Sequence, residues 1–149
     1  MPKRLINRSP SKDAIYGDNN GASEPVPVEG AVGAVSFGDG ALHNLASVTT
    51  TSGYEALSLV VWSIPYAVTT TSAGTLTFTL RLDGSIVDQV VVDLPDGVEE
   101  FRDIYNRNIL LGPGAGSHVY LTQIQSNGGV SAGSTEASPA PTRLDVVPF

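Results

Sequence analysis

Hydrophobic and polar residues alternate along several short segments of this 149-residue chain. The clearest case is residues 75–82, where Leu76, Phe78, Leu80 and Leu82 are separated by threonines and one arginine. A period of two over eight residues predicts a β-strand with one face in a core.

A turn signal follows this strand directly. Asp83-Gly84 is a preferred pair for the two-residue turn of a β-hairpin. The segment after it carries apolar residues with a single parity as far as Leu94, and Asp88 interrupts that row. We therefore predict a hairpin over residues 75–94, with a bulge or a sheet edge at Asp88.

The most apolar segment, Tyr54 to Tyr66, has hydrophobic residues with both parities. Leu57, Leu59 and Val61 point one way, and Val60, Trp62 and Ile64 point the other. Apolar residues on both faces are typical of a central strand that is covered on both sides. We expect one face, with Trp62, in the domain core and the other at a subunit interface, and we expect Pro65 to end or bend the strand.

The rest of the chain adds further short strands separated by turns. Strands are predicted around Val32 to Phe37, Leu42 to Thr51, Asn108 to Leu111, His118 to Gln125 and Leu144 to Phe149. Residues 98–105 suit a helical turn or a twisted strand, whereas the composition of Asn127–Pro141 indicates a loop. We expect a second loop at Ala67–Gly74. About eight strands at this spacing predict an all-β protein, an antiparallel β-sandwich. A jelly roll is our first choice of topology and an immunoglobulin-like sandwich the second.

The first 29 residues differ from this pattern and divide the chain into an extended N-terminal arm (1–29) and a sandwich domain (30–149). Pro25 and Pro27 favour extended backbone, and apolar residues are sparse before them. An arm with so little core of its own is expected to lie on a neighbouring molecule.

Charge is distributed unevenly between these two parts. Four of the eight basic residues lie within the first twelve positions, no acidic residue precedes Asp13, and the formal net charge of the whole chain is −7. A basic arm on an acidic body predicts a device for attachment. The expected contact residues are Lys3, Arg4, Leu5, Ile6, Arg8 and Lys12. We favour protein over nucleic acid as the partner, because four charges make a small footprint and the acidic body repels phosphate.

Composition excludes several classes of chemistry. The chain has no cysteine, so it has no disulfide, thiolate nucleophile or cysteine-ligated metal. Its longest apolar run, Leu57 to Pro65, is shorter than the roughly 20 residues that span a membrane. The first residues lack the apolar stretch of a secretory signal. We expect a soluble protein that is made in the cytoplasm.

Candidate chemical groups are few. His43 and His118 are the only histidines, and Ser117-His118 lacks the Gly-x-Ser-x-Gly turn of a hydrolase nucleophile. Glu99, Glu100 and Asp103 form an acidic cluster, either a solvated face or a contact for the basic arm of a neighbouring copy. We expect no catalytic residue, no metal and no cofactor.

Two segments carry a family resemblance. Residues 74–84 (GTLTFTLRLDG) and 112–121 (GPGAGSHVYL), behind a proline-rich arm, resemble jelly-roll structural proteins of tailed bacteriophages, such as capsid decoration proteins and head fibres, and trimers of the tumour-necrosis-factor type. The resemblance implies a homotrimer or a capsid-bound subunit without catalysis, whose arm reaches onto the capsid or another copy.

The expected function is therefore that of a virion structural protein, a capsid decoration (cement) or minor capsid component. Its expected partners are itself and the major capsid protein or another virion protein, and its expected location is the virion. An alternative is a carbohydrate- or receptor-binding module of a phage fibre or spike, with its site on the loops Ala67–Gly74 and Asn127–Pro141. A sandwich hydrolase is a third possibility.

Overall fold

The computed structural model describes residues 27–52, 57–136 and 141–148, and these residues contain eight β-strands and no helix. The strands are β1 (Val28–Val32), β2 (Ser36–Phe37), β3 (Leu42–Ser52), β4 (Ser58–Leu82), β5 (Ser85–Leu94), β6 (Phe101–Leu111), β7 (Gly116–Thr135) and β8 (Thr142–Pro148). The all-β prediction is confirmed. Residues 98–105, for which a helical turn and a strand remained open, contain the start of β6, and the strand predicted at Asn108 to Leu111 is the end of β6.

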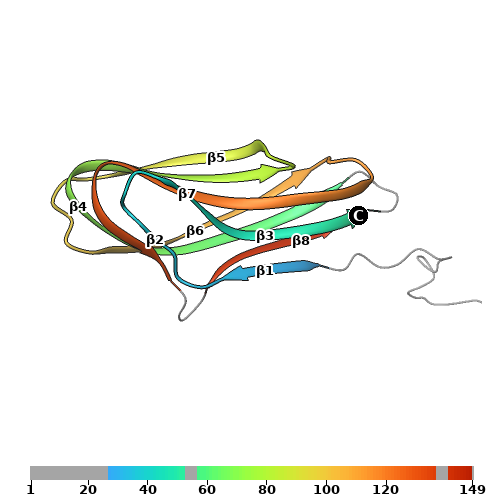
Figure 1. The fold of residues 1–149 in the computed structure, drawn as a ribbon, viewed down its shortest axis with the longest axis horizontal. Coiled ribbons are helices and arrows are strands. Elements are labelled where there is room, and N and C mark those ends of the chain that lie inside the picture. The colour runs from blue at the N-terminus through green and yellow to red at the C-terminus, as the bar shows by residue number, and fades with distance from the viewer. Residues whose placement is uncertain (1–26, 53–56, 137–140, 149) are drawn as a thin grey trace, which may run out of the picture.

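The strands form one antiparallel sheet that curls into two layers (Figure 1). The first layer has the order β1-β8-β4-β6, to which β4 contributes residues 58–68. The second layer has the order β3-β7-β4-β5, to which β4 contributes residues 74–82. Strands that alternate between two four-stranded layers in this way form a jelly roll. The predicted fold class is confirmed.

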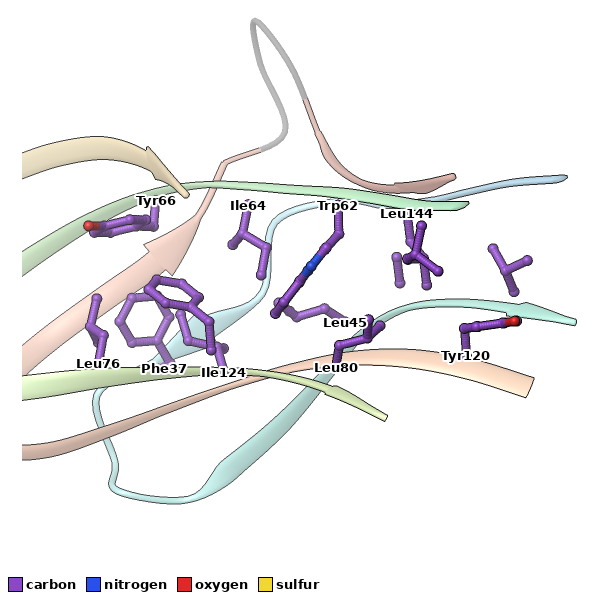
Figure 2. Packing of buried hydrophobic residues seen from close by; sticks show 14 of the residues in the cluster. Phe37, Leu45, Trp62, Ile64, Tyr66, Leu76, Leu80, Tyr120, Ile124 and Leu144 are labelled. Atoms are coloured by element: carbon purple, nitrogen blue, oxygen red, sulfur yellow. The ribbon is translucent and has the colours of Figure 1, made fainter. Parts of the chain in front are cut away.

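The core lies between the two layers. Trp62, Ile64 and Tyr66 of β4 and Leu144 of β8 point from the first layer toward Leu76, Leu80, Tyr120 and Ile124 of the second (Figure 2). Each of these side chains is almost completely buried. The even-numbered residues of β4 point inward on both sides of its bend, because successive side chains of a strand point to opposite faces. Trp62 is in the core, as its place in the apolar segment predicts.

The predicted hairpin at residues 75–94 is present as the second half of β4 and β5. Asp83 and Gly84 have φ values of 51° and 87°, as the left-handed two-residue turn requires. The register shifts by one residue where Leu80 pairs with Asp88 and Arg81 pairs with Ile86, so a bulge lies beside Asp88. The sequence located both features because each depends on adjacent residues.

Pro65 neither ends β4 nor interrupts its pairing with β6, contrary to our expectation. On its other side β4 pairs with β8 as far as Ser63 and with β7 from Tyr66 onward. Pro65 lies at this change of partner, and its carbonyl accepts a hydrogen bond from the backbone nitrogen of Glu136. The N–H and C=O groups of one strand residue point to the same side of the strand. The N–H that Pro65 lacks would therefore point to the position between the end of β8 pairing and the start of β7 pairing, where its absence breaks no continuous ladder.

The predicted loops at 67–74 and 127–141 are wrong over most of their length. Residues 67–74 lie within β4, and residues 127–135 lie within β7. The two segments pair with each other at the bend where both strands cross between layers, with register irregularities around Thr70 and Gly74. Glycine, serine and alanine are needed here because the two backbones approach closely, as they do at Gly129 beside Ser72. Residues 137–140 lie outside the described part of the chain.

Candidate functional site

An apolar patch lies on the outer face of the first layer. The odd-numbered residues at the start of β4 point away from the core, and Leu59 has Leu110 of β6 and Val147 of β8 as its cross-strand neighbours. Leu110 is 58% exposed and Leu57 is 43% exposed. We call this set the outer patch; its residues are Leu57, Leu59, Val61, Leu110 and Val147. The sequence predicted that this face of β4 is apolar, and its role as an interface stays a prediction.

Charged residues border the outer patch on the β1 side. Nη2 of Arg143 lies 2.7 Å from Oε1 of Glu29 and 3.3 Å from Oδ1 of Asp145. The hydrogen bond to Glu29 and the charge of Asp145 raise the pKa of Arg143. An apolar centre with a polar rim is the usual composition of a protein interface.

The two long edges of the sandwich differ in how closely the layers approach. At the β1/β3 edge, a Cβ built on Gly30 would lie 2.6 Å from Cγ2 of Val48 and 2.9 Å from the carbonyl oxygen of Ser47, so the layers meet. At the other edge, β5 and β6 each pair only with β4 among the described strands. We call this second edge the open seam.

Strand β6 is the most exposed long strand of the described chain. Eight of its eleven residues are exposed, including Ile104 at 50% and Phe101 at 39%. Ile104 lies on the outer face, and Phe101 lies on the face toward the open seam, because Ile104 pairs with Pro65 and Phe101 pairs with the buried Val68. Both faces of β6 are therefore accessible near its start, whereas Tyr105, Ile109 and Leu111 pack against the core.

Aromatic side chains line the inner end of the open seam. The ring of Tyr105 stacks on Phe78 with a centroid separation of 4.6 Å and meets Trp62 edge-on at 5.1 Å. Burial raises the pKa of Tyr105, and burial together with the charge of Asp103 raises the pKa of Tyr66 to about 12. Both phenols are therefore neutral over the physiological pH range.

Three polar atoms at this seam lack a hydrogen-bond partner, although they are buried. They are Nε1 of Trp62, the hydroxyl of Tyr105 and Oδ2 of Asp88. Nε of Arg107 lies 2.7 Å from Oδ2 of Asp88, but the two groups are not aligned for a hydrogen bond. Buried polar groups are usually paired. Oγ of Ser58, the hydroxyl of Tyr120 and Oγ1 of Thr142 also lack a partner among the described residues, so such atoms are not confined to the seam.

Carboxylates are concentrated in the sequence around the start of β6. Asp93, Asp96, Glu99, Glu100 and Asp103 lie within eleven residues, where Arg102 is the only base. Arg102 forms ion pairs with Glu100 and with Glu136, the residue after β7, and their charges raise its pKa. The predicted acidic cluster is thus partly neutralised by the domain's own arginine, while a net negative charge remains.

The histidines are held by structural contacts. His118 has Nδ1 at 2.7 Å from Oδ2 of Asp83 and Nε2 at 2.9 Å from the carbonyl oxygen of Gly114. Both ring nitrogens therefore face acceptors. Ser117 is adjacent to His118 in β7, so its side chain points to the opposite face of the strand and away from the imidazole.

The contacts of His118 predict a pH-dependent contribution to stability. Its hydrogen bond to Asp83 raises the pKa of His118, and the same bond lowers the pKa of Asp83. A raised histidine pKa stabilises the folded state below the unfolded value of about 6.5, and this contribution is lost as the pH rises through the folded pKa. Urea unfolding should therefore show that His118→Gln destabilises the protein more at pH 5.5 than at pH 8.5. An equal effect at both pH values would contradict an imidazolium at this position.

Other described groups form no comparable cluster. His43 places Nε2 at 2.8 Å from Oδ1 of Asp39. It is distant from the other histidine, because His118 pairs with Thr50, seven residues after His43 in the chain. Among the described residues, no three histidine or acidic side chains are arranged to hold a metal ion. Two open hollows near the bend each contain one carboxylate, Asp93 and Asp39 respectively. The described part of the chain contains no helix that is long and apolar enough to cross a membrane.

The six predicted contact residues of the arm lie outside the described part of the chain. These residues are Lys3, Arg4, Leu5, Ile6, Arg8 and Lys12. Their binding role stays a prediction. Val28 and Glu29, assigned to the arm from the sequence, pair with Val146 and Asp145 of β8 as part of β1.

No family model matches the sequence, and no curated protein matches it. Among solved structures, Eiger TNF from S. frugiperda is similar over 84% of this chain and 92% of its own, with 12% identity and a TM-score of 0.46. An exo-β-1,3-galactanase from Phanerochaete chrysosporium is similar over 84% of this chain, with 15% identity and a TM-score of 0.28. This chain spans only 29% of the length of the galactanase.

Sequence reasoning missed the exposure of β6. Its residues mix apolar, acidic, basic and amide side chains without a clear period, because an edge strand with two accessible faces does not need alternation. One signal could have indicated this exposure. Phe101, Ile104 and Leu110 are mixed with five polar residues, and the polar residues do not occupy alternate positions.

Proposed function

We propose that the protein is a structural component of a virion, a capsid decoration protein or minor capsid component. In this role the sandwich self-associates, and the N-terminal arm attaches it to a virion protein. The trimer implied by the family resemblance is the expected assembly. The observation that carries the proposal is the outer patch, a group of aliphatic side chains on a central strand and its neighbours that the described residues leave uncovered.

The surface chemistry supports a protein partner. Scattered apolar residues are common on protein surfaces, whereas adjacent apolar residues with a charged border mark interaction sites. Leu59 has apolar cross-strand neighbours on both sides, and Arg143 with its two carboxylate partners lies at the border. Arms that bind individually with low affinity suit an assembly in which several act together.

The carbohydrate-binding alternative loses the location that we expected for its site. Residues 67–74 and most of 127–141 belong to paired strands at the bend.

Light scattering of the full-length protein tests self-association. We expect an oligomer for the native chain and a smaller species for Leu110→Asp, because a carboxylate in the outer patch loses its hydration if the patch is buried. Val91→Asp is the matched control, since Val91 is 56% exposed on β5 of the other layer. Both variants should keep the native far-UV circular dichroism spectrum.

Two results would contradict the proposed self-association. One is a monomeric native chain at all concentrations, and the other is the same loss of mass for Leu110→Asp and Val91→Asp. Replacing Lys3, Arg4, Arg8 and Lys12 with glutamine in the full chain tests attachment separately. If the arm serves only for attachment to a different virion protein, the oligomer should persist in this variant.

A further inference from the structure

Strand β6 differs from the other strands that border the sandwich. It pairs with β4 over all eleven residues in continuous register, and no described strand pairs with its other side. In contrast, β1 has only five residues, and β3 and β5 each contain a register shift. Long and regular edges can accept another strand, and proteins usually protect them with prolines, lysines or bulges. Strand β6 has none of these three features, although it carries the charged residues Arg102, Asp103 and Arg107.

The backbone direction of β6 follows from Pro65. The carbonyl of Pro65 points toward β7, away from β6, so Pro65 and Ile104 form a pair without mutual hydrogen bonds. The N–H and C=O groups of Ile104 therefore point outward at the free edge, and those of Asn106 and Asn108 do the same by alternation. Consistently, the N–H of Ile104 donates to Oδ1 of its neighbour Asp103 at 2.8 Å.

The side chains beside this edge match the composition of the N-terminal arm. In an extended arm, Leu5 and Ile6 would point to opposite faces, and β6 offers an exposed apolar side chain on each face, Phe101 and Ile104. The arm has four basic residues and no acid before Asp13. The segment from Asp93 to Asp103 has five carboxylates and one arginine.

The root of the arm and the acidic start of β6 lie at diagonally opposite corners of the first layer (Figure 1). Val28 pairs with Val146, which pairs with Val60, whereas Phe101 pairs with Val68 at the other end of the strand segment. An arm that leaves at one corner and an acceptor at the opposite corner suit a head-to-tail contact between copies. Such heterologous contacts close into rings when the rotation between copies permits it.

We propose that the N-terminal arm of one copy binds in extended conformation along the free edge of β6 of a second copy. Backbone hydrogen bonds to Asn106, Asn108 and the carbonyl of Ile104 provide the affinity, as in other cases of strand addition. The arm runs parallel to β6, so that Lys3 and Arg4 lie against the carboxylates at the start of β6, Leu5 lies against Ile104, and Ser9 reaches Asn108. This inference rests on the proposed role of the arm as a tether and names the surface that receives it.

Because the native chain has no cysteine, single substitutions can report this contact. One full-length protein carries Ser9→Cys in the arm, and a second, of different tag length, carries Asn108→Cys beside the free edge. The two are mixed and oxidised mildly. We expect a disulfide-linked heterodimer whose yield is several-fold higher than with the control Val91→Cys, which lies on β5. The yield should fall with increasing salt, because exposed charges are screened.

A second substitution in the acceptor chain tests strand addition itself. Asn106→Pro removes an N–H that points outward and is not needed for pairing with β4, so the fold should persist while cross-linking is lost. Asn106→Ala keeps the N–H and should retain cross-linking. Glu99→Lys combined with Glu100→Lys and Asp103→Lys should also abolish it.

Three results would overturn the inference. These are equal cross-linking to positions 91 and 108, an unchanged yield with Asn106→Pro, and an intramolecular disulfide in the Ser9→Cys/Asn108→Cys chain without heterodimer in the mixture. The last result would assign the arm to its own domain. Self-association through the outer patch is measured independently with Leu110→Asp, so either idea can fail while the other stands.

Discussion

Replacing Trp62 with alanine is expected to lower the free energy of unfolding by about 3–5 kcal/mol. The indole is fully buried between the two layers and packs edge-on against Tyr105. Its Nε1 has no hydrogen-bond partner, so the loss comes from packing and the cavity left behind. Domains of this size are stable by only about 5–15 kcal/mol, so the variant should lose a large fraction of the stability of the fold.

Urea unfolding followed by circular dichroism measures this effect, because Trp62 is the only tryptophan and its removal abolishes the fluorescence signal. Trp62→Phe is the matched control, since it keeps an aromatic ring and leaves a smaller cavity, and it should cost clearly less. A Trp62→Ala variant within about 0.5 kcal/mol of the native protein, the range of surface substitutions, would show that the indole does not bridge the layers.

The sequence predicted the features that depend on neighbouring residues. The Asp83-Gly84 turn has a fixed backbone requirement, and the alternation from Leu76 to Leu82 follows from a single buried face. The bulge beside Asp88 was also visible, because a carboxylate in an apolar row must leave the register or find a partner. Asp88 does both, since Arg107 of β6 lies beside it across the open seam.

The features that sequence reasoning missed depend on residues far apart in the chain. Pro65 is tolerated because β8 stops pairing beside it and β7 begins, an exchange set by residues about 70 positions later. Strand β6 has no recognisable period because its second neighbour is absent from the described chain. The outer patch was foreseen from Leu57, Leu59 and Val61, but its extension through Leu110 and Val147 required the register of three strands.

The bend between the two layers gives the second large prediction. Gly129→Ala is expected to destabilise the protein by about 3 kcal/mol, at the upper end of the usual range for an overpacked site. A Cβ at position 129 would overlap with both the hydroxyl and the backbone oxygen of Ser72, and a backbone atom cannot rotate away as a flexible side chain can. Gly129 does not have a positive φ, so the cost measures space alone.

Gly33→Ala is the matched control, because a Cβ there has no atom within 4 Å and Gly33 does not have a positive φ either. This variant should be neutral or slightly more stable, since alanine restricts the unfolded chain more than glycine does. Thermal unfolding of both variants tests whether residues 127–135 are a loop, as the composition indicated, or a strand that packs against β4. A mobile loop, as the composition indicated, would accept alanine at both positions equally. A strand held against β4 at the bend accepts it only at Gly33, because the curl of the sheet depends on the close approach of β4 and β7 at this point.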